Sequence, residues 1–581
     1  MVKTWAVGAV VATLGLIFVV GPSIAHGRIP GDLGDARFIS YILEHFFRWI
    51  TGQEASFWSA NFFYPFPLTI AFGDNFLGDG FIYAAFRLMG FVREDAFRLW
   101  YITGFVINFT VAAYALVRLG FSRLPAALGA FLFTFGLPIT AQEGHAQLLY
   151  RFGVPLAVLA FENFRVRKNL PNLILVAIWT TWQFYCSIYI GYFLSLLLIS
   201  LACGHAICHP RGPISAVQAW TGQVPRLWSR STPSAKIASL LILLLLAACM
   251  VLLWMPYLEV SHLYGFRRQW SEVASMLPRP ASYLLSNNSL LWPTGRLFDA
   301  LPMRHEHAMF IGIAPLLTIV IAVALRILGR ARLDSLFAPI ALAVLLLMLL
   351  TLWIHGFSAY RILTWLPGLN AVRGVTRIIT VLLFPCGAMF AASLDAIIGA
   401  RLPSWPRAVT VALLTMLAVF ESSYIVHYVT TKRAWQERLA AVAAELPPKV
   451  PPAPILLLAP QPGDPAPWGR EIDAMLLAQD HNWRTLNGYS GNTPPRPELA
   501  GGCQDAAVSL VSGLTFLGRN SEQTYAALAR DVLMIGYPPC DEAELLRQPG
   551  VTMLAGPLPA QLMTNISLRI DSLKLHDSRL V

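Results

Sequence analysis

The sequence predicts an α-helical polytopic membrane protein with about eleven spans and a C-terminal α/β domain outside the membrane. Two observations predict the membrane part. Of the 581 residues, 56% are hydrophobic and 13% are charged, whereas soluble domains carry about a quarter charged residues. Many uncharged runs also reach the roughly 20 residues that a helix needs to cross a bilayer. A third observation predicts the outer domain, because the composition changes to an ordinary polar content after residue 430.

The predicted spans follow the uncharged runs in order. Residues 170–209 contain no Asp, Glu, Lys or Arg and are long enough for two spans, with the polar-aromatic stretch 182–192 as the bend between them. Two weaker spans, 144–161 and 408–429, are interrupted by charged residues, and either could instead lie at the membrane interface. The other predicted spans are 4–26, 99–117, 124–142, 237–258, 308–325, 335–360 and 378–394.

The distribution of positive charge predicts the orientation, because Lys and Arg concentrate in short cytoplasmic loops. If the N-terminus is cytoplasmic, the long loops 26–98 and 259–306, the loop 361–377 and the tail all lie outside. The net charge of +11 then reflects membrane orientation, so nucleic acid is not expected as a partner. The first run lacks a clear small-residue cleavage site and is interpreted as an uncleaved span. The cytoplasmic basic residues would be Lys3, Arg118, Arg123, Arg165, Arg167, Lys168, Arg211, Arg226, Arg230, Lys236, Arg326, Arg330, Arg332, Arg401 and Arg407.

The predicted domains are a membrane domain, 1–430, and a soluble α/β domain, 431–581. Pro-rich joints follow the boundary, and apolar runs between turn residues favour strands. Cys503 and Cys540 could form a disulfide in an oxidising compartment, which the sequence leaves open. The expected elements of the outer domain are strands at 455–459 and 551–554 and helices at 470–479 and 521–533.

The first outer loop begins with two carboxylates at membrane level, Asp32 and Asp35. Three residues apart at a helix start, they can point the same way and act as a base or as metal ligands. The alternative is that Asp32 caps the helix and Asp35 stabilises its positive end. The helix that follows, 38–50, has a broad apolar face and is expected to lie in the membrane interface. Asp74 and Asp79 form a second acidic pair, in ordinary turn sequences.

Other ionisable groups lie at the predicted outer ends of spans, where such groups commonly mark a substrate cavity. Arg offers a bidentate fork for phosphate, and Arg151 is the strongest candidate because it interrupts an apolar segment, with snorkelling to the interface as the alternative. His305 and His307 flank Glu306, but alternate residues on a helix diverge, so metal binding is not expected there. The candidate site residues in these positions are His145, Arg151, Glu306, Arg361, Arg373 and Arg377.

Signatures of soluble nucleotide-using enzymes are missing from the sequence. There is no Walker loop, no G-x-G-x-x-G after a predicted strand and no G-x-S-x-G elbow. The predicted cytoplasmic loops are short and basic, so a nucleotide-driven reaction on that side is disfavoured. The energy for a transfer reaction would have to be present in the substrate.

In their order along the chain, these features resemble the GT-C class of integral membrane glycosyltransferases, and more narrowly a group of largely uncharacterised bacterial members. The resemblance covers most of the chain. It consists of an acidic motif after the first span, a long first outer loop, about eleven spans and an outer soluble tail. The motifs that carry it are Gly31-Asp32-Leu33-Gly34-Asp35, Gly73-Asp74-Asn75-Phe76-Leu77-Gly78, residues 145–155, Glu306-His307-Ala308-Met309-Phe310-Ile311-Gly312, residues 366–377 and Asn487-Gly488-Tyr489-Ser490-Gly491.

The resemblance implies that a polyprenyl-phosphate sugar, in the outer leaflet of a bacterial inner membrane, donates its sugar with inversion to an envelope glycan, lipid or protein. The base would be Asp32 or Asp35. The motif here departs from an adjacent acidic pair, so the choice stays open. Arg151, Arg373 and Arg377 would compete to bind the donor phosphate. Some members use a divalent metal and others use none. If a metal binds, Asp32, Asp35, Asp74 and Asp79 are the candidate ligands.

Two other functions compete with glycosyl transfer. A transporter or flippase of lipid-linked glycan is one, although transporters often contain internal repeats and no repeat is evident here. A non-catalytic envelope assembly factor is the other. Trp468, Trp483 and Tyr489 in the tail could stack on sugar rings or could pack in the core of the outer domain.

Overall fold

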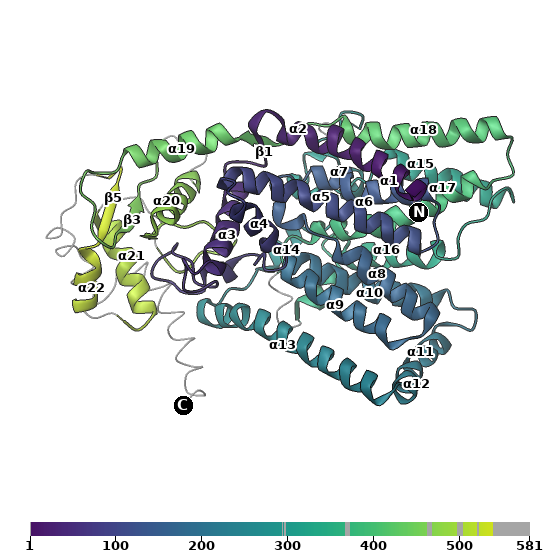
Figure 1. The fold of residues 1–581 in the computed structure, drawn as a ribbon, viewed down its shortest axis with the longest axis horizontal. Helices are drawn as coiled ribbons and strands as arrows, with labels where there is room; N and C mark the ends of the chain where they lie inside the picture. The colour runs from purple at the N-terminus through teal and green to yellow at the C-terminus, as the bar shows by residue number, and fades with distance from the viewer. Residues whose placement is uncertain are drawn as a thin grey trace.

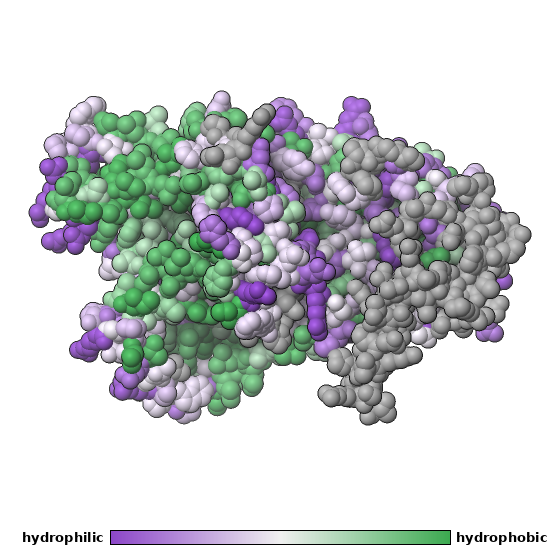
Figure 2. Space-filling view, turned by 180° about the vertical axis from the view of Figure 1, so that it is seen from behind, coloured by the Kyte–Doolittle hydropathy of each residue, from purple (hydrophilic) through white to green (hydrophobic). Residues whose placement is uncertain are grey.

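The computed structural model describes residues 2–292, 294, 298–365, 372–461, 468–496, 503–519 and 522–537. Figure 1 shows a bundle of helices that run along the long axis, with a smaller α/β part at one end. From behind, hydrophobic residues cover much of the bundle, and hydrophilic residues lie at its left edge and near the middle of the view (Figure 2). With its long apolar helices, the arrangement is that of a multi-pass membrane protein.

Six helical segments in the described ranges are long and apolar enough to cross a membrane: Ala6–Gly27, Arg93–Arg118, Arg123–Thr140, Ile188–Ile207, Pro233–Tyr264 and Val375–Ile398. The other predicted spans contain helices that are shorter or less apolar, so the count of eleven stays a prediction. The helices of the bundle are α1 (Val2–Gly15), α2 (Gly21–Ile24), α5 (Arg93–Arg118), α6 (Arg123–Phe135), α7 (Leu137–Thr140), α8 (Gly153–Arg167), α9 (Leu170–Cys186), α10 (Ile188–Ile207), α11 (Pro213–Thr221), α12 (Gln223–Arg230), α13 (Pro233–Tyr264), α15 (Ile313–Ile327), α16 (Phe337–Thr351), α17 (Ile379–Ile398) and α18 (Ser404–Ser423).

The bend predicted within 182–192 is confirmed. Helix α9 ends at Cys186 and α10 begins at Ile188, with extended backbone at Ser187. The carboxylate of Asp74 accepts hydrogen bonds from the Ile188 N–H (2.8 Å) and the Ser187 hydroxyl (3.1 Å). It therefore satisfies donors at the start of α10 that have no partner within the helix.

The span predicted at 144–161 is wrong in its first half, because α8 begins only at Gly153. The preceding backbone finds its partners on α5 instead. The Asn108 side chain donates to the carbonyl of Leu149 (2.7 Å) and accepts from the N–H of Arg151 (3.0 Å). A polar side chain from a neighbouring helix thus replaces the bonds that a continuous helix would make.

Loops that carry the predicted cytoplasmic charges lie together at one end of the bundle. The N–H of Arg401 donates to the carbonyl of Arg330 (2.8 Å), and the N–H of Ser122 donates to the carboxylate of Asp395 (2.9 Å). Figure 1 shows α11 and α12 at this end and the α/β part at the other. These segments therefore meet at one end of the bundle, and the orientation of the chain across the membrane stays a prediction.

The α/β part is joined to the first outer loop by a short ribbon. Strand β1 (Arg28–Pro30) pairs antiparallel with β2 (Val429–Thr431), so the predicted domain boundary falls inside a strand. Around the ribbon lie α3 (Asp35–Ile50), α4 (Gly80–Leu88) and α14 (Trp270–Ser275). Beyond it, α19 (Lys432–Ala444), α20 (Trp468–His481), α21 (Cys503–Phe516) and α22 (Glu522–Ala529) surround a parallel sheet of order β4–β3–β5, with β3 (Ile455–Leu458), β4 (Arg484–Thr485) and β5 (Val532–Ile535).

The predicted strand at 455–459 and helix at 470–479 are confirmed as β3 and α20. The helix predicted at 521–533 is too long, because α22 ends at Ala529 and Val532 already pairs with Ile455. Pairing beside a buried strand overrides the local helical preference there. The strand predicted at 551–554 and the partner Cys540 lie outside the described residues.

Helix α3 does not expose its apolar face, as a helix predicted to lie in the membrane interface would. It is buried against α20: the Arg37 guanidinium pairs with Asp473 (2.7 Å) at 0% exposure, and the Gln479 amide donates to the carbonyl of Tyr41 (3.0 Å). Only the end of α3, at Trp49 and Ile50, is exposed. The apolar face that suggested the interface packs inside the protein.

A close approach between two helices of the bundle gives a test of this packing. A Cβ at Gly129 on α6 would lie 2.5 Å from the carbonyl oxygen of Gly387 on α17. We therefore expect Gly129→Ala to destabilise the protein by about 1–3 kcal/mol through overpacking, lowering the Tm measured in detergent. Gly8→Ala is the matched control, because a Cβ at Gly8 meets nothing within 4 Å and should leave the Tm equal or higher. Equal Tm values for the two variants would contradict this packing.

Candidate active site

The two carboxylates of the first motif lie where β1 leads into α3, and this turn is held tightly. Gly31 has a φ of +88°, and a Cβ there would lie 3.1 Å from the Cα of Gly144. The N–H of Gly31 donates to the carbonyl of Tyr428 (2.8 Å). Glycine is required at this position by both conformation and space.

The buried carboxylate of Glu143 fixes the other side of the turn. It accepts hydrogen bonds from the Ser23 hydroxyl (2.6 Å) and the Tyr428 N–H (2.7 Å), and it lies 2.8 Å from the His427 ring. Glu143 thus joins the end of the first helical segment, the turn before α8 and strand β2. The acidic motif is held in place from three directions.

Asp32 is half-buried and has no side-chain partner among the described residues. Its carboxylate accepts a hydrogen bond from the N–H of Gly34 (2.9 Å), at the start of α3. Burial and the nearby charge of Asp35 raise the pKa of Asp32, although backbone N–H groups partly offset this. Asp32 is therefore a carboxylate with an increased affinity for a proton.

Asp35 is held at both oxygens. The Tyr489 hydroxyl donates to one oxygen (2.5 Å), and Nδ1 of His145 lies 2.9 Å from the other. Burial alone would raise the pKa of Asp35, but the bonds from His145 and Tyr489 and the charge of Arg377 outweigh it and lower that pKa. Asp35 is therefore ionised and fixed in position, unlike Asp32.

A chain of charges leads from Asp35 into the bundle. Nε2 of His145 lies 3.6 Å from the carboxylate of Glu306, which forms a bidentate pair with Arg377 (2.7 and 3.2 Å). Burial and Arg377 lower the pKa of His145, but Asp35 and Glu306 raise it by more, so the net shift is upward. His145 thus lies between two carboxylates, and its Nε2 is also 3.4 Å from the Arg377 guanidinium. We call Asp35, His145, Glu306 and Arg377 the charge network.

Three arginines lie near the network. Arg373 and Arg268 share one carboxylate oxygen of Glu272, at 2.8 and 3.2 Å. Arg268 also donates to the carbonyl of Gly491 (2.7 Å), two residues from Tyr489. The Arg361 guanidinium lies 5.4 Å from the centre of the Trp270 ring. Two guanidinium groups on one carboxylate leave a net positive charge, which suits a phosphate.

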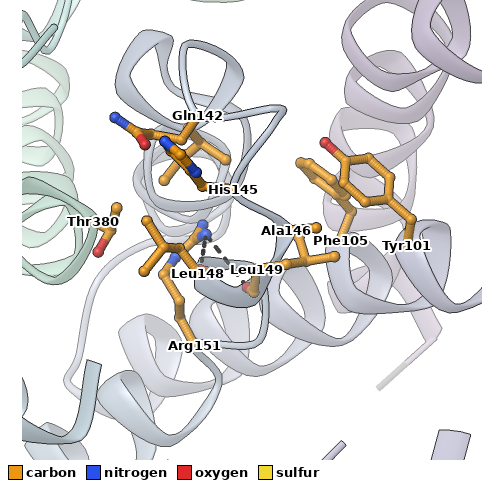
Figure 3. Close-up of a pocket in the computed structure, with 10 residues that line it drawn as sticks. Tyr101, Phe105, Gln142, His145, Ala146, Leu148, Leu149, Arg151 and Thr380 are labelled. Atoms are coloured by element: carbon orange, nitrogen blue, oxygen red, sulfur yellow. Dashed lines mark hydrogen bonds between the residues drawn. The ribbon is translucent and has the colours of Figure 1, made fainter. Parts of the chain in front are cut away.

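The structure removes Arg151 from the predicted phosphate site. Its guanidinium donates to the carbonyls of Phe133 (2.9 Å), Leu148 (3.1 Å) and Leu149 (3.3 Å), and the residue is 1% exposed. Figure 3 shows this head group beside a small cavity that His145 also lines. Arg151 satisfies backbone groups in a kinked segment, and that is why a charge interrupts the apolar run.

The second acidic pair also lies outside the site. Asp74 caps α10, and burial raises its pKa to about 6. Asp79 is 2% exposed at the start of α4, where burial and then Asp74 raise its pKa well above the usual value. The four predicted metal ligands are thus not brought together. In the described part of the chain, no three His, Cys, Asp or Glu residues are grouped as metal ligands, so no step is derived through a metal.

The flanking histidines diverge from Glu306, as predicted. His307 contacts the Ser282 hydroxyl (2.6 Å) and the Ser275 carbonyl (2.9 Å), away from the charge network. The carbonyl of His305 accepts from the Asn287 side chain (3.3 Å). Of this triplet, only the Glu306 side chain enters the site.

Tyr489 is the site residue whose role the sequence did not predict. It lies in the tail, and its ring packs edge-on against Phe38 of α3. Neighbouring Gly488 allows this approach, because a Cβ there would lie 2.3 Å from the Phe63 ring. Trp468 packs against the acidic turn, 2.6 Å from where a Cβ at Gly34 would lie, and Trp483 stacks on His481. These aromatic side chains therefore contact protein in this structure.

Comparison with known proteins finds similarity among solved structures alone. No protein-family model matches the chain, and no curated protein matches it. Among solved structures, the apo oligosaccharyltransferase of Archaeoglobus fulgidus aligns with a TM-score of 0.44 and 12% sequence identity, over 91% of this chain and 71% of that one. The function proposed below therefore rests on the site residues themselves.

The different surroundings of the two carboxylates predict opposite effects on stability. At neutral pH, Asp35→Asn should lower the free energy of unfolding by about 2 kcal/mol, because bonds to a charged group are lost. Asp32→Asn should raise the Tm, because it removes a carboxylate whose ionised form is disfavoured in the folded protein. The measurement is thermal unfolding in detergent, with the exposed Asp299→Asn as control.

The pH dependence gives the sign of the Asp35 contribution. Since folding lowers the pKa of Asp35, its stabilisation is present above the unfolded value of about 3.9 and is lost as pH falls through the folded value. The Tm difference between wild type and Asp35→Asn should thus close below about pH 4. A difference that is constant down to pH 3 would contradict the assignment.

Proposed function

We propose that the protein is an inverting glycosyltransferase that moves a sugar from a polyprenyl-phosphate donor to an acceptor hydroxyl at the extracytoplasmic face of a bacterial inner membrane. The observation that carries the proposal is the pair of unlike carboxylates at the junction of the bundle and the α/β part. Asp32 has no side-chain partner in the described residues, whereas Asp35 is held by His145 and Tyr489. Such a pair divides proton transfer and positioning between two groups.

Asp32 is the proposed general base. A base works best when its pKa is close to the pH at which it acts, and burial and Asp35 raise that of Asp32. The acceptor hydroxyl gives its proton to the Asp32 carboxylate while its oxygen attacks C1 of the sugar. The bond between C1 and the phosphate oxygen breaks, and the phosphate leaves with the electron pair. One displacement inverts the configuration at C1.

Arg268 and Arg373 are the proposed groups for the leaving phosphate. Their shared carboxylate, Glu272, neutralises only one of the two charges. The remaining charge would stabilise the negative charge that develops on the phosphate oxygen. Arg377 is not assigned this role, because Glu306 already occupies its guanidinium in bidentate fashion. It is a positioning residue that acts through Glu306 and His145.

The charge network explains why a second carboxylate is needed at the site. Ionised Asp35 keeps the pKa of Asp32 raised by repulsion, and it keeps its own charge because His145 and Tyr489 stabilise it. The proton taken by Asp32 therefore cannot move easily to Asp35. The tail contributes to this setting through Tyr489, which makes the α/β part a component of the proposed site.

The first test is the activity of the matched carboxylate variants. Envelope glycans would be profiled by mass spectrometry in a deletion strain that carries wild type, Asp32→Asn or Asp299→Asn at equal membrane expression. Asp32→Asn should fail to restore the missing sugar, with transfer reduced at least about 100-fold, the usual contribution of a general base. Asp299→Asn should restore it.

Two outcomes would overturn the proposal. If Asp32→Asn restores the full glycan, the motif is structural. If the deletion strain accumulates complete lipid-linked glycan on the inner leaflet, the protein is a flippase. Loss of one sugar unit in both the deletion strain and Asp32→Asn supports transfer, and the missing mass gives the sugar class.

The arginine assignment predicts different behaviour for two kinds of arginine variant. Arg268→Gln and Arg373→Gln should each reduce kcat/KM for the lipid-linked donor, by about 10- to 100-fold, while the Tm changes little. Arg151→Gln should instead lower the Tm, because buried backbone carbonyls lose their donor. Purified protein with radiolabelled donor would give both measurements. A normal kcat/KM in the double variant Arg268→Gln, Arg373→Gln would exclude this phosphate site.

A further inference from the structure

A second surface lies at the end of the bundle opposite the proposed active site. Helices α11 and α12 lie there between α10 and α13 (Figure 1), and Gly222 alone, with a φ of −73° and a ψ of −15°, joins them end to end. We call residues 213–230 the α11–α12 segment. Residues 208–212 join α10 to α11, and residues 231–232 join α12 to α13. Both flanking helices are long and apolar enough to span a membrane. These short connections keep the α11–α12 segment next to the ends of two candidate spans.

The sequence around the α11–α12 segment has an unusual charge distribution. Residues 163–258 contain seven Lys or Arg and no Asp or Glu. Arg226 and Arg230, four residues apart, share one face of α12 and are exposed. Neither forms an ion pair within the described part of the chain. Figure 2 shows hydrophilic residues at this end of the molecule.

The α11–α12 segment also exposes apolar side chains beside these charges. Ile214 and Val217, three residues apart on α11, are 74% and 48% exposed, and Trp228 on α12 is 38% exposed. No residue of α12 that is described is buried. Helices of this length are marginal in water without a partner for their apolar face. The neighbouring helices α9 and α10 cover only part of the α11–α12 segment.

We propose that the α11–α12 segment is a binding surface for anionic phospholipid headgroups. Its apolar side chains would enter the boundary between headgroups and acyl chains, and Trp is enriched at that depth. Its arginines would pair with lipid phosphates and with the net negative charge of the surface. The absence of acidic residues from 163 to 258 leaves no competing carboxylate on the α11–α12 segment. Charge complementarity and the short connections to two spans select a lipid surface over a soluble partner.

The test compares lipid binding by the full-length protein in mild detergent, with dioleoyl-phosphatidylglycerol and dioleoyl-phosphatidylcholine as probes, by native mass spectrometry. Each basic residue near an anionic surface contributes about fivefold to binding. Wild type should prefer phosphatidylglycerol, and Arg226→Gln with Arg230→Gln should reduce that preference by about 25-fold. Arg226→Lys with Arg230→Lys should largely keep it, because the charge remains.

A matched control removes the same charge from the other end. Arg433 and Lys449 are exposed on the α/β part, and Arg433→Gln with Lys449→Gln should leave the lipid preference unchanged. Sugar transfer by the variants of the α11–α12 segment should also be unchanged. That result shows that these variants are folded and separates this proposal from the proposed function.

Three outcomes would overturn the lipid surface. Wild type could show no preference for phosphatidylglycerol. The double variant Arg226→Gln, Arg230→Gln could keep the full preference, which would assign lipid binding to other basic loops. Inorganic phosphate at about 10 mM, a concentration far below that needed to screen a lipid surface, could remove the bound lipid completely. That last result would assign the arginines to a free phosphate ion.

Discussion

Two contacts of the Asp35 carboxylate, an ion pair with His145 and a hydrogen bond from Tyr489, are the interaction on which the rest of the site depends. One comes from His145 in the bundle and the other from Tyr489 in the tail. They fix the start of α3, and with it the turn that carries Asp32. A carboxylate that is bonded at both oxygens keeps its charge, and a fixed negative charge nearby changes the proton affinity of its neighbour. The chemistry proposed for Asp32 follows from the immobility of Asp35.

The same interaction accounts for the buried charges deeper in the bundle. Glu306 would be costly to bury without Arg377, and His145 links this ion pair to Asp35. Removing Arg377 would leave Glu306 as an uncompensated buried charge. Such a network holds a site in one geometry, which matters for a reaction that depends on the direction of attack at one carbon.

Much of the bundle could be predicted from the sequence because a bilayer restricts the chain to few solutions. Uncharged runs located the helices, and the polar-aromatic stretch located the bend at Ser187. Arg151 was misassigned because the sequence cannot show that Asn108, 43 residues earlier, takes over the backbone bonds around it. Asp32 and Asp35 stood out as charges at membrane level. Tyr489 could not be connected to them, because the contact spans 454 residues and depends on tertiary packing. Arg268 carried a signal that was overlooked: with Arg267 it is a basic pair at the predicted outer end of a long span, against the usual distribution of charge.

The contact between Asp35 and Tyr489 also orders events in the life of the chain. Residues near the N-terminus are made and inserted into the bilayer well before Tyr489 leaves the ribosome, since synthesis adds about 5–20 residues per second. Until residue 489 has been made and the α/β part has folded against α3, the Asp35 carboxylate lacks its tyrosine and the acidic turn lacks its Trp468 neighbour. The site is thus completed 454 residues after the Asp35 carboxylate is made. If the proposed function holds, a nascent chain carries an acidic motif that is not yet set for transfer.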